Sequence, residues 1–231
     1  MKDKVNIICL YWVGDYRNRD FTEKDIENLR ATVDKHIDRP YEFYCLTNQP
    51  DADLPAIKIP FKNDWPGWWA KVELFRPDLP CGRTLYLDTD TYIVNSLQPI
   101  LDYEGDLVMF PTRRHKSMWG KLCKGGWVYR YQAATMLFTP GQLAWLYYKF
   151  KDGAEELMKM YRGEQDMYGM WIPNQPTFPK EWMVKMDTIM RRKIEYQESQ
   201  LPKETIIVTG QPNPLPWRNP PEWLIKRARG D

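Results

Sequence analysis

The most informative stretch of the chain is Arg83-Thr-Leu-Tyr-Leu-Asp-Thr-Asp-Thr-Tyr-Ile-Val94, where Asp88 and Asp90 interrupt an apolar run. The residues before Asp88 have the composition of a buried β-strand. Two acids in such surroundings cost free energy unless a cation or hydrogen-bond donors compensate their charge. Because a solvated turn would be flanked by polar residues, the stretch predicts a strand that delivers two carboxylates to a ligand site.

The N-terminal part of the chain predicts a strand followed by a helix. Val5 to Trp12 form a short apolar run, and Gly14 with Asp15 breaks it, which is typical of a buried strand ending in a loop. Thr22-Glu-Lys-Asp25 has the pattern of a capping box. Apolar residues then follow at helical spacing to about residue 36, namely Ile26, Leu29 and Val33.

The rest of the chain continues this alternation. Strands are expected over 42–47, 56–60, 106–111, 134–139 and 205–209, and helices over 68–75 and 142–161, with two more helical stretches after Gly163. Alternating strands and helices predict an α/β fold with a mainly parallel central sheet and helices on both faces. Such sheets bind ligands outside the carboxyl ends of their strands, where Asp88, Asp90 and the loop after Trp12 would meet.

Length and composition fit one folded domain spanning residues 1–231. The formal net charge is only +2 with both signs interspersed, which disfavours nucleic acid as a partner. The apolar run near the N-terminus is only as long as a strand, so we expect no transmembrane segment and a cytoplasmic location.

The paired acids suit chemistry on a diphosphate. When a nucleotide-diphospho-sugar loses its sugar, negative charge grows on the leaving group. A hard divalent cation held by one or two carboxylates and by phosphate oxygens stabilises that charge. Asp88-Thr-Asp90 at a strand end meets this requirement, although the tripeptide alone also occurs in ordinary solvated turns.

Three motifs then resemble a known family. They are Gly67-Trp-Trp-Ala-Lys-Val-Glu-Leu-Phe-Arg-Pro77, the block Gly82 to Val94, and Gly163-Glu-Gln-Asp166, in that order. In these the chain resembles retaining GT-A glycosyltransferases of family 8, especially small stand-alone ones from bacteria and phages. The resemblance implies a GT-A fold, Mn²⁺ or Mg²⁺ as cofactor, a nucleotide-sugar donor such as a UDP-sugar, and an acceptor that the sequence does not reveal. It also implies that 1–110 form a nucleotide-sugar-binding half, and 111–231 an acceptor half with a C-terminal closing segment.

The resemblance also implies roles for donor-site residues. Asp88 would contact the ribose and the metal, and Asp90 would be a main metal ligand. Lys71, after the paired tryptophans, would face the donor, although an exposed surface lysine is the alternative without the resemblance. Tyr11, at the end of the first strand, is placed with these three residues in the donor-binding set.

Gln165 and Asp166 match the family's Gln-Asp pair near the anomeric carbon of the sugar. Either side chain could stabilise an oxocarbenium-like centre, and the resemblance leaves open a covalent intermediate or same-face attack. Asp166 could also be an ordinary acid in the first turn of a helix.

One motif departs from the family. The family closes with a strand followed by His-Gly-Lys-Pro, and here Thr209 stands for the His and Gln211 for the Lys. A hydroxyl is a poorer divalent ligand than imidazole, and Gln carries no charge. A nucleotide-sugar-binding protein or a decayed enzyme is therefore the second hypothesis. His115 could replace the missing ligand, although a solvated loop histidine is the simpler interpretation, and His36 is expected at the surface.

Two further possibilities concern loops. Residues 112–130 form a long basic and aromatic loop that could bind a diphosphate or an acidic acceptor, or could simply be solvated. A nucleotidyltransferase would share a similar sheet, but it needs a Gly-rich basic loop after the first strand. The segment from Val13 to Arg19 has one glycine, so this hypothesis ranks last.

Overall fold

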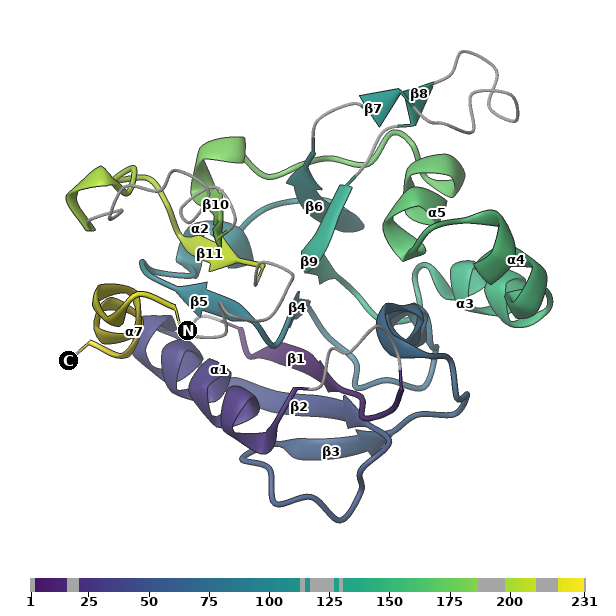
Figure 1. Cartoon of the computed structure of the whole chain (residues 1–231), viewed down its shortest axis with the longest axis horizontal. Coiled ribbons are helices and arrows are strands. Elements are labelled where there is room, and N and C mark those ends of the chain that lie inside the picture. The colour runs from purple at the N-terminus through teal and green to yellow at the C-terminus, as the bar shows by residue number, and fades with distance from the viewer. Residues whose placement is uncertain are drawn as a thin grey trace.

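The computed structural model of the chain describes residues 3–15, 21–112, 115–116, 127–128, 131–186, 198–210 and 220–230. Its centre is a six-stranded sheet with the strand order β3-β2-β1-β4-β9-β6 (Figure 1). The strands are β1 (Val5–Tyr11), β2 (Tyr41–Thr47), β3 (Ile57–Pro60), β4 (Thr84–Leu87), β6 (Leu107–Pro111) and β9 (Tyr131–Phe138).

The sheet is mainly parallel, as the alternation of strands and helices predicts. β1 pairs in parallel with β2 and β4, and β2 pairs in parallel with β3. Only β9 runs the other way, between β4 and β6. The carboxyl ends of β1 and β4 therefore lie at one edge of the sheet, where the sequence predicts the ligand site.

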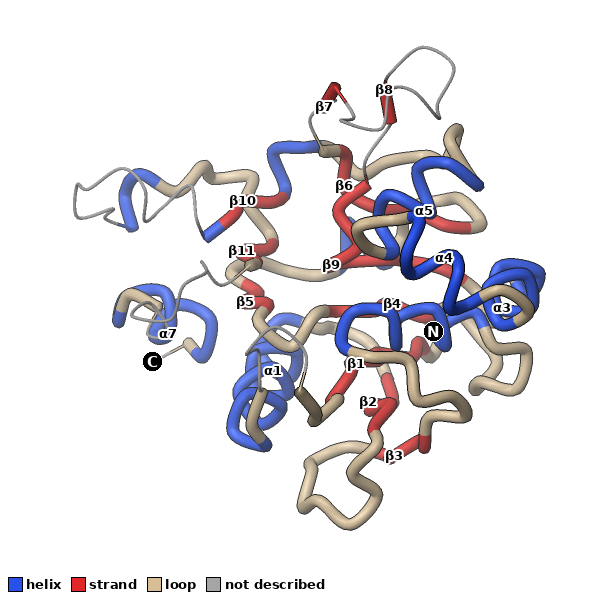
Figure 2. The backbone as a smooth tube through the Cα atoms, turned by 45° about the vertical axis from the view of Figure 1, so that its right-hand side comes forward, coloured by secondary structure: helices blue, strands red, loops and turns tan. Residues whose placement is uncertain are grey.

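Helices cover both faces of the sheet (Figures 1 and 2), which confirms the predicted fold class. On one face α1 (Glu23–His36) buries Ile26, Leu29 and Val33 against alternate residues of β1 such as Ile7. The opposite residues of β1, Ile8 and Leu10, belong to a second core beneath η1 (Gly67–Phe75), α3 (Ala144–Lys151) and α5 (Glu164–Trp171). The predicted capping box is present, with the Thr22 N–H donating to Asp25 at 2.8 Å.

Two predicted helices differ from the structure. The single helix expected over 142–161 is wrong, because the chain forms α3 and α4 (Ala154–Met160) with a break at Asp152 and Gly153. The segment expected to be an amphipathic helix over 68–75 is the 3₁₀ helix η1, and all its residues from Trp69 to Phe75 are buried. Its apolar spacing therefore does not mark a single buried face.

A smaller sheet joins two distant parts of the chain. β5 (Thr91–Ile93) follows the paired acids and pairs antiparallel with β11 (Ile207–Thr209), which pairs in parallel with β10 (Met183–Lys185). Strands β5 and β10 were not predicted. The remaining elements are α2 (Gln98–Leu101), β7 (His115–Lys116), β8 (Trp127–Val128), η2 (Lys180–Trp182), η3 (Glu198–Gln200) and α7 (Glu222–Arg229).

The C-terminal helix α7 lies beside α1 (Figure 1). A ring nitrogen of His36, Nε2, lies 3.2 Å from the carbonyl oxygen of Ala228, and Arg227 donates to the carbonyl oxygen of Val94 at 3.3 Å. The expectation that His36 is a surface residue is therefore wrong: it is half-buried between the two helices. Neither the helix nor this contact was predicted from the sequence.

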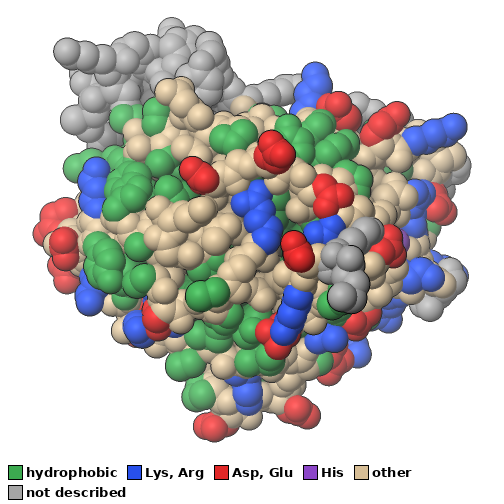
Figure 3. Space-filling view, turned by 180° about the vertical axis from the view of Figure 1, so that it is seen from behind, with side chains coloured by type: hydrophobic (Ala, Val, Ile, Leu, Met, Phe, Trp, Pro, Cys, Tyr) green, Lys and Arg blue, Asp and Glu red, His purple; other side chains and the backbone are tan. Residues whose placement is uncertain are grey.

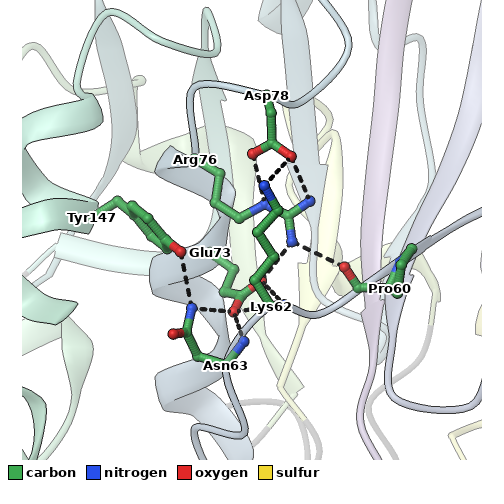
Figure 4. A network of polar contacts seen from close by, with 7 residues as sticks. All are labelled: Pro60, Lys62, Asn63, Glu73, Arg76, Asp78 and Tyr147. Atoms are coloured by element: carbon green, nitrogen blue, oxygen red, sulfur yellow. Dashed lines mark hydrogen bonds and ion pairs between the residues drawn. The ribbon is translucent and has the colours of Figure 1, made fainter.

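A buried ionic network fixes η1 to the loop after β3 (Figure 4). The carboxylate of Glu73 is fully buried and accepts from the amides of Lys62 and Asn63, at 2.9 Å and 2.6 Å. It also accepts from the Asn63 side chain at 2.7 Å and from Arg76 at 2.8 Å. Arg76 in turn donates to the carbonyl oxygen of Pro60 at 2.9 Å. The backbone hydrogen bonds of a 3₁₀ helix have poorer geometry than those of an α-helix, so these side-chain contacts help to stabilise η1.

Tryptophans mostly serve as packing residues. Trp65 and Trp69 are buried and pack on Phe150 with ring centroids 4.8 Å and 5.4 Å away. Viewed from behind, hydrophobic side chains also gather at the edge formed by α3 and α4 (Figure 3), where Trp145 is 43% exposed.

Within the described residues, no helix combines the length and apolar character needed to cross a bilayer.

Candidate active site

The paired acids lie at the carboxyl end of β4. The amide of Asp88 donates to the carbonyl oxygen of Ala134 in β9 at 2.8 Å, and the amide of Thr91 donates to the carbonyl oxygen of Asp88 at 3.0 Å. Asp88 and Asp90 therefore occupy a tight turn between β4 and β5. The Asp88 side chain is 22% exposed, and Asp90 is almost buried.

The turn is fixed to the end of the first strand. The hydroxyl of Thr89, between the two acids, donates to the carbonyl oxygen of Leu10 at 2.7 Å. The loop after β1 is held in turn by Asn48, which donates to the carbonyl oxygen of Val13 at 2.8 Å and accepts from its amide at 3.0 Å. The carboxyl ends of β1, β2 and β4 thus form one connected edge. Tyr11 lies at this edge, but its side chain is buried in the core beneath α1.

Lys71 is the direct partner of Asp88. Its Nζ lies 2.7 Å from Oδ1 and 3.0 Å from Oδ2 of that carboxylate, which also accepts from the phenol of Tyr86. Lys71 is only 8% exposed, so the alternative of an ordinary surface lysine is wrong. A buried ammonium without a partner would be very costly, and the pair with Asp88 removes that cost.

Glu164 completes this group and was not among the predicted site residues. Its Oε1 lies 3.4 Å from Lys71 Nζ, close enough for an ion pair but without the geometry of a hydrogen bond. The residue is 2% exposed and belongs to the first turn of α5. The signal for it in the sequence is its place inside the motif Gly163-Glu-Gln-Asp166, directly before the predicted catalytic pair.

The pKa values in this group reflect burial and the charges of neighbouring side chains. Burial alone would lower the pKa of Lys71, but attraction by Asp88 and Glu164, and more weakly by Asp90, raises it above its ordinary value. Burial raises the pKa of Tyr86, and repulsion from Asp88 adds to that effect, so the phenol stays protonated as a donor. Burial likewise raises the pKa of Glu164, with Lys71 opposing the shift.

The predicted catalytic pair lies beside Glu164 in the first turn of α5. Gln165 and Asp166 are both half-buried, unlike Glu164, whose side chain points inward to Lys71. The N-cap of the helix is Gly163, where an added Cβ would lie 3.1 Å from the indole Nε1 of Trp68. Glycine at this position therefore lets the start of α5 approach η1, which also carries Lys71.

The C-terminal strand reaches the paired acids. Thr209 is opposite Thr91 in the ladder between β11 and β5, and Thr91 follows Asp90 directly. The two hydroxyl oxygens lie 3.4 Å apart, and both residues are buried. Gln211 and the side chains of the basic loop 113–130, including His115, lie outside the described residues.

The residues at this edge that could hold a divalent cation are the two acids of the turn. Asp88 and Asp90 offer carboxylate oxygens, which Mg²⁺ and Mn²⁺ accept. Within the described part of the chain, no group of three or more His, Cys, Asp or Glu side chains is arranged to hold a metal. Two carboxylates completed by phosphate oxygens and water is a usual arrangement for Mg²⁺.

Solved structures share this architecture across almost the whole chain. A galactosyltransferase, LgtC, solved with donor and acceptor sugar analogues, aligns with a TM-score of 0.62 and 13% identity over 97% of this chain and 94% of its own. The fold is that of GT-A glycosyltransferases. GlyE from Streptococcus pneumoniae TIGR4 aligns with a TM-score of 0.64 and 15% identity over 98% of this chain. The mainly parallel GT-A-type sheet and its likeness to family 8 enzymes are thus confirmed.

Other comparisons set the scope of this likeness. The chain covers 60% of GlyE and 46% of the bifunctional glycosyltransferase WbbM, which aligns with a TM-score of 0.55 and 13% identity. No protein-family model matches the sequence, and neither does any curated protein. At these identities, the comparisons show a shared GT-A fold. The chemistry depends on the individual residues at the sheet edge.

Proposed function

We propose that the chain is a glycosyltransferase that moves a sugar, with retention, from a UDP-sugar to an acceptor with the help of Mn²⁺ or Mg²⁺. The observation that carries the proposal is the placement of Asp88 and Asp90 at the carboxyl end of β4, on a fold shared with a galactosyltransferase solved with donor and acceptor sugar analogues. In open α/β sheets, this edge is where ligands bind. The proposed place of action is the cytoplasm.

In this proposal, Asp88 and Asp90 hold the cation through carboxylate oxygens. A bound divalent cation stabilises the negative charge that develops on the diphosphate leaving group. Tyr86 orients the Asp88 carboxylate through a hydrogen bond, and Lys71 contributes a positive charge at the same edge.

Sugar transfer itself is assigned to the first turn of α5. Gln165 and Asp166 are proposed to face the anomeric carbon, where positive charge develops as the bond to the leaving group breaks. A carboxylate or amide oxygen near that carbon stabilises the transition state electrostatically. Glu164 is buried behind this turn with Lys71, so it supports the site from within.

A second candidate is a protein that binds a nucleotide sugar without turning it over. The observation in its favour is Thr209, which the sequence match puts in place of the family's imidazole ligand and whose hydroxyl oxygen lies 3.4 Å from that of Thr91. Both candidates bind a nucleotide sugar, and they differ in whether donor is consumed. Release of free UDP from a UDP-sugar, measured with and without Mn²⁺, separates them.

Binding is tested by thermal unfolding with a panel of nucleotide sugars and Mn²⁺. A donor at about one hundred times its Kd stabilises the folded protein by about 2.7 kcal/mol, which raises Tm measurably. We expect UDP-sugars to raise Tm only when Mn²⁺ is present, and Asp90→Asn to abolish the effect without lowering the Tm of the free protein. If no nucleotide sugar raises Tm, or if Asp90→Asn responds like the wild type, the proposal is wrong.

A further inference from the structure

The contact between Lys71 and Asp88 has the form of a cation held by a chelating carboxylate. One nitrogen contacts both oxygens, at 2.7 Å and 3.0 Å, and the two residues come from different elements, η1 and β4. The Lys71 side chain is 10% exposed, so water does not compete strongly for the ammonium. The ion pair is therefore part of the folded site and is less weakened by solvent than a surface ion pair.

This arrangement leaves little of Asp88 for a metal. A carboxylate offers about four lone-pair positions. Lys71 takes one on each oxygen, and Tyr86 takes another on Oδ1. A divalent cation on the same carboxylate would also lie within a few ångströms of the ammonium, and like charges at that distance repel strongly in a partly buried site. Lys71 and a cation on Asp88 therefore exclude each other.

A second acceptor for Lys71 is already in place. Oε1 of Glu164 is buried, accepts no hydrogen bond, and lies 3.4 Å from the same Nζ. A lysine ammonium has three donors and a flexible stem, so a small rotation would exchange Asp88 for Glu164. A buried carboxylate oxygen without a donor is costly, and this exchange would satisfy it.

We propose that Lys71 occupies the cation's place on Asp88 in the donor-free protein, and that it moves to Glu164 when a divalent cation binds. The proposal rests on the cation site assigned above to Asp88 and Asp90. Lys71 thereby weakens cation binding in the absence of donor, and Glu164 reduces that penalty by accepting the displaced ammonium. The cation then binds best together with the donor diphosphate, whose oxygens add ligands to it.

The test is Mn²⁺ titration without donor, with free Mn²⁺ followed by electron paramagnetic resonance. We expect Lys71→Met to bind Mn²⁺ about tenfold more tightly than the wild type, which corresponds to about 1.4 kcal/mol. Lys71→Gln, which keeps donors for both carboxylates, serves in the same way if the Met variant does not fold. The matched control is Lys62→Met, which removes an exposed lysine 2.7 Å from Asp78 and should leave Mn²⁺ affinity unchanged.

Glu164→Gln provides the second arm. It should weaken Mn²⁺ binding in the wild-type background, because Lys71 then has no anionic alternative to Asp88. The same substitution should have a smaller effect in the Lys71 variant, and this non-additivity is the signature of action through Lys71. Equal effects in both backgrounds would mean that Glu164 acts directly on the cation by its charge, and would overturn the proposed exchange.

Asp90→Asn separates this inference from the proposed function. If it weakens Mn²⁺ binding while the folded Lys71 variants bind Mn²⁺ no more tightly than the wild type, the cation site stands and the competition by Lys71 is wrong. If the wild type and Asp90→Asn bind Mn²⁺ equally, the cation site itself is misplaced, and the proposed function fails with it.

Discussion

Thr209 and Thr91 face each other across the ladder of β11 and β5, with their hydroxyl oxygens 3.4 Å apart. Since Thr91 follows Asp90 in the chain, this contact places the C-terminal strand beside the paired acids. A side chain at position 209 that extends past Thr91 would lie near the Asp88 and Asp90 turn. The position is therefore suitable for adding a metal ligand.

Replacing Thr209 by His should tighten Mn²⁺ binding in the absence of donor. The substitution adds an imidazole to two carboxylates, a ligand set well suited to Mn²⁺. The effect on Mg²⁺ should be smaller, because Mg²⁺ prefers oxygen ligands and retains water. Calorimetric titration of both proteins with each ion measures the difference, and about a tenfold gain for Mn²⁺ is expected.

Thr209→Val is the matched control for this prediction, since it has nearly the same shape but lacks the hydroxyl. It should leave Mn²⁺ affinity close to that of the wild type. If the folded His variant also binds Mn²⁺ like the wild type, the end of β11 does not contribute to the cation's surroundings. The correspondence between Thr209 and the family's histidine would then be withdrawn.

Asp166→Ala should reduce turnover far more than donor binding. In the proposed mechanism, Asp166 acts on charge that exists mainly in the transition state, so its loss should lower kcat by about 10²-fold and leave KM nearly unchanged. Initial rates of UDP release at varied donor concentration measure both quantities. A change confined to KM would show that Asp166 only positions the substrate.

Glu155→Ala is a suitable control for Asp166. Both residues are acids in the first turn of a short helix, α4 for Glu155 and α5 for Asp166, and Glu155 is exposed. A general effect of removing a negative charge from a helix N-terminus would appear in both variants. A loss of kcat in Asp166→Ala alone would assign the effect to the site.

Much of the fold follows from local patterns in the sequence. The apolar run before Gly14 and the capping box at Thr22 predict β1 and α1 because burial and helix initiation depend on neighbouring residues. The one long helix expected over 142–161 fails at Gly153, because a glycine can both interrupt a helix and begin the next one. Strands β5 and β10 were missed because they are only three residues long and depend on partners distant in the sequence.

In the candidate site too, features that depend on neighbouring residues were predicted, and contacts between distant residues were not. Asp88 and Asp90 stand out because acids within an apolar run are unusual. The burial of Lys71 and its pairing with Asp88 depend on packing between η1 and β4, which no spacing in the sequence specifies. Glu164 was not predicted as a site residue, because the packing of α5 against η1 decides which polar side chain of its motif points inward.

His36 should make the folded protein less stable at acidic pH. Burial lowers the pKa of His36 below its ordinary value of 6.5, and the carbonyl oxygens of Ala228 and Arg227 oppose this shift only in part. The folded protein then binds the proton less readily than the unfolded chain does. The contribution of neutral His36 is therefore constant above the ordinary pKa and is lost as the pH falls through and below that value.

The measurement is urea unfolding of the wild type and His36→Gln at about pH 7.5 and about pH 5. The Gln variant retains an N–H donor for Ala228 but does not titrate. The wild type should lose more unfolding free energy between the two pH values than the variant does. Equal losses would mean that His36 is protonated as easily in the folded protein as in the unfolded chain.

Glu73→Ala should be among the more destabilising single substitutions in the chain. The carboxylate of Glu73 is fully buried and accepts from two backbone amides, from the Asn63 side chain and from Arg76 (Figure 4). Its removal leaves buried donors and the Arg76 guanidinium without their acceptor. Breaking a buried ion pair in this way costs about 3–5 kcal/mol of unfolding free energy.

The control for Glu73 is Glu27→Ala, which breaks an ion pair between exposed side chains, with Lys24 Nζ 2.7 Å from the carboxylate. Surface pairs contribute less than about 1 kcal/mol, so urea unfolding should show a far smaller loss for this variant. Because η1 carries both Glu73 and Lys71, Glu73→Ala should also loosen the support of Lys71 and weaken donor binding. A loss at Glu73 no larger than that at Glu27 would mean that the 3₁₀ segment is held by its apolar contacts alone, and that the ionic network contributes little to placing Lys71.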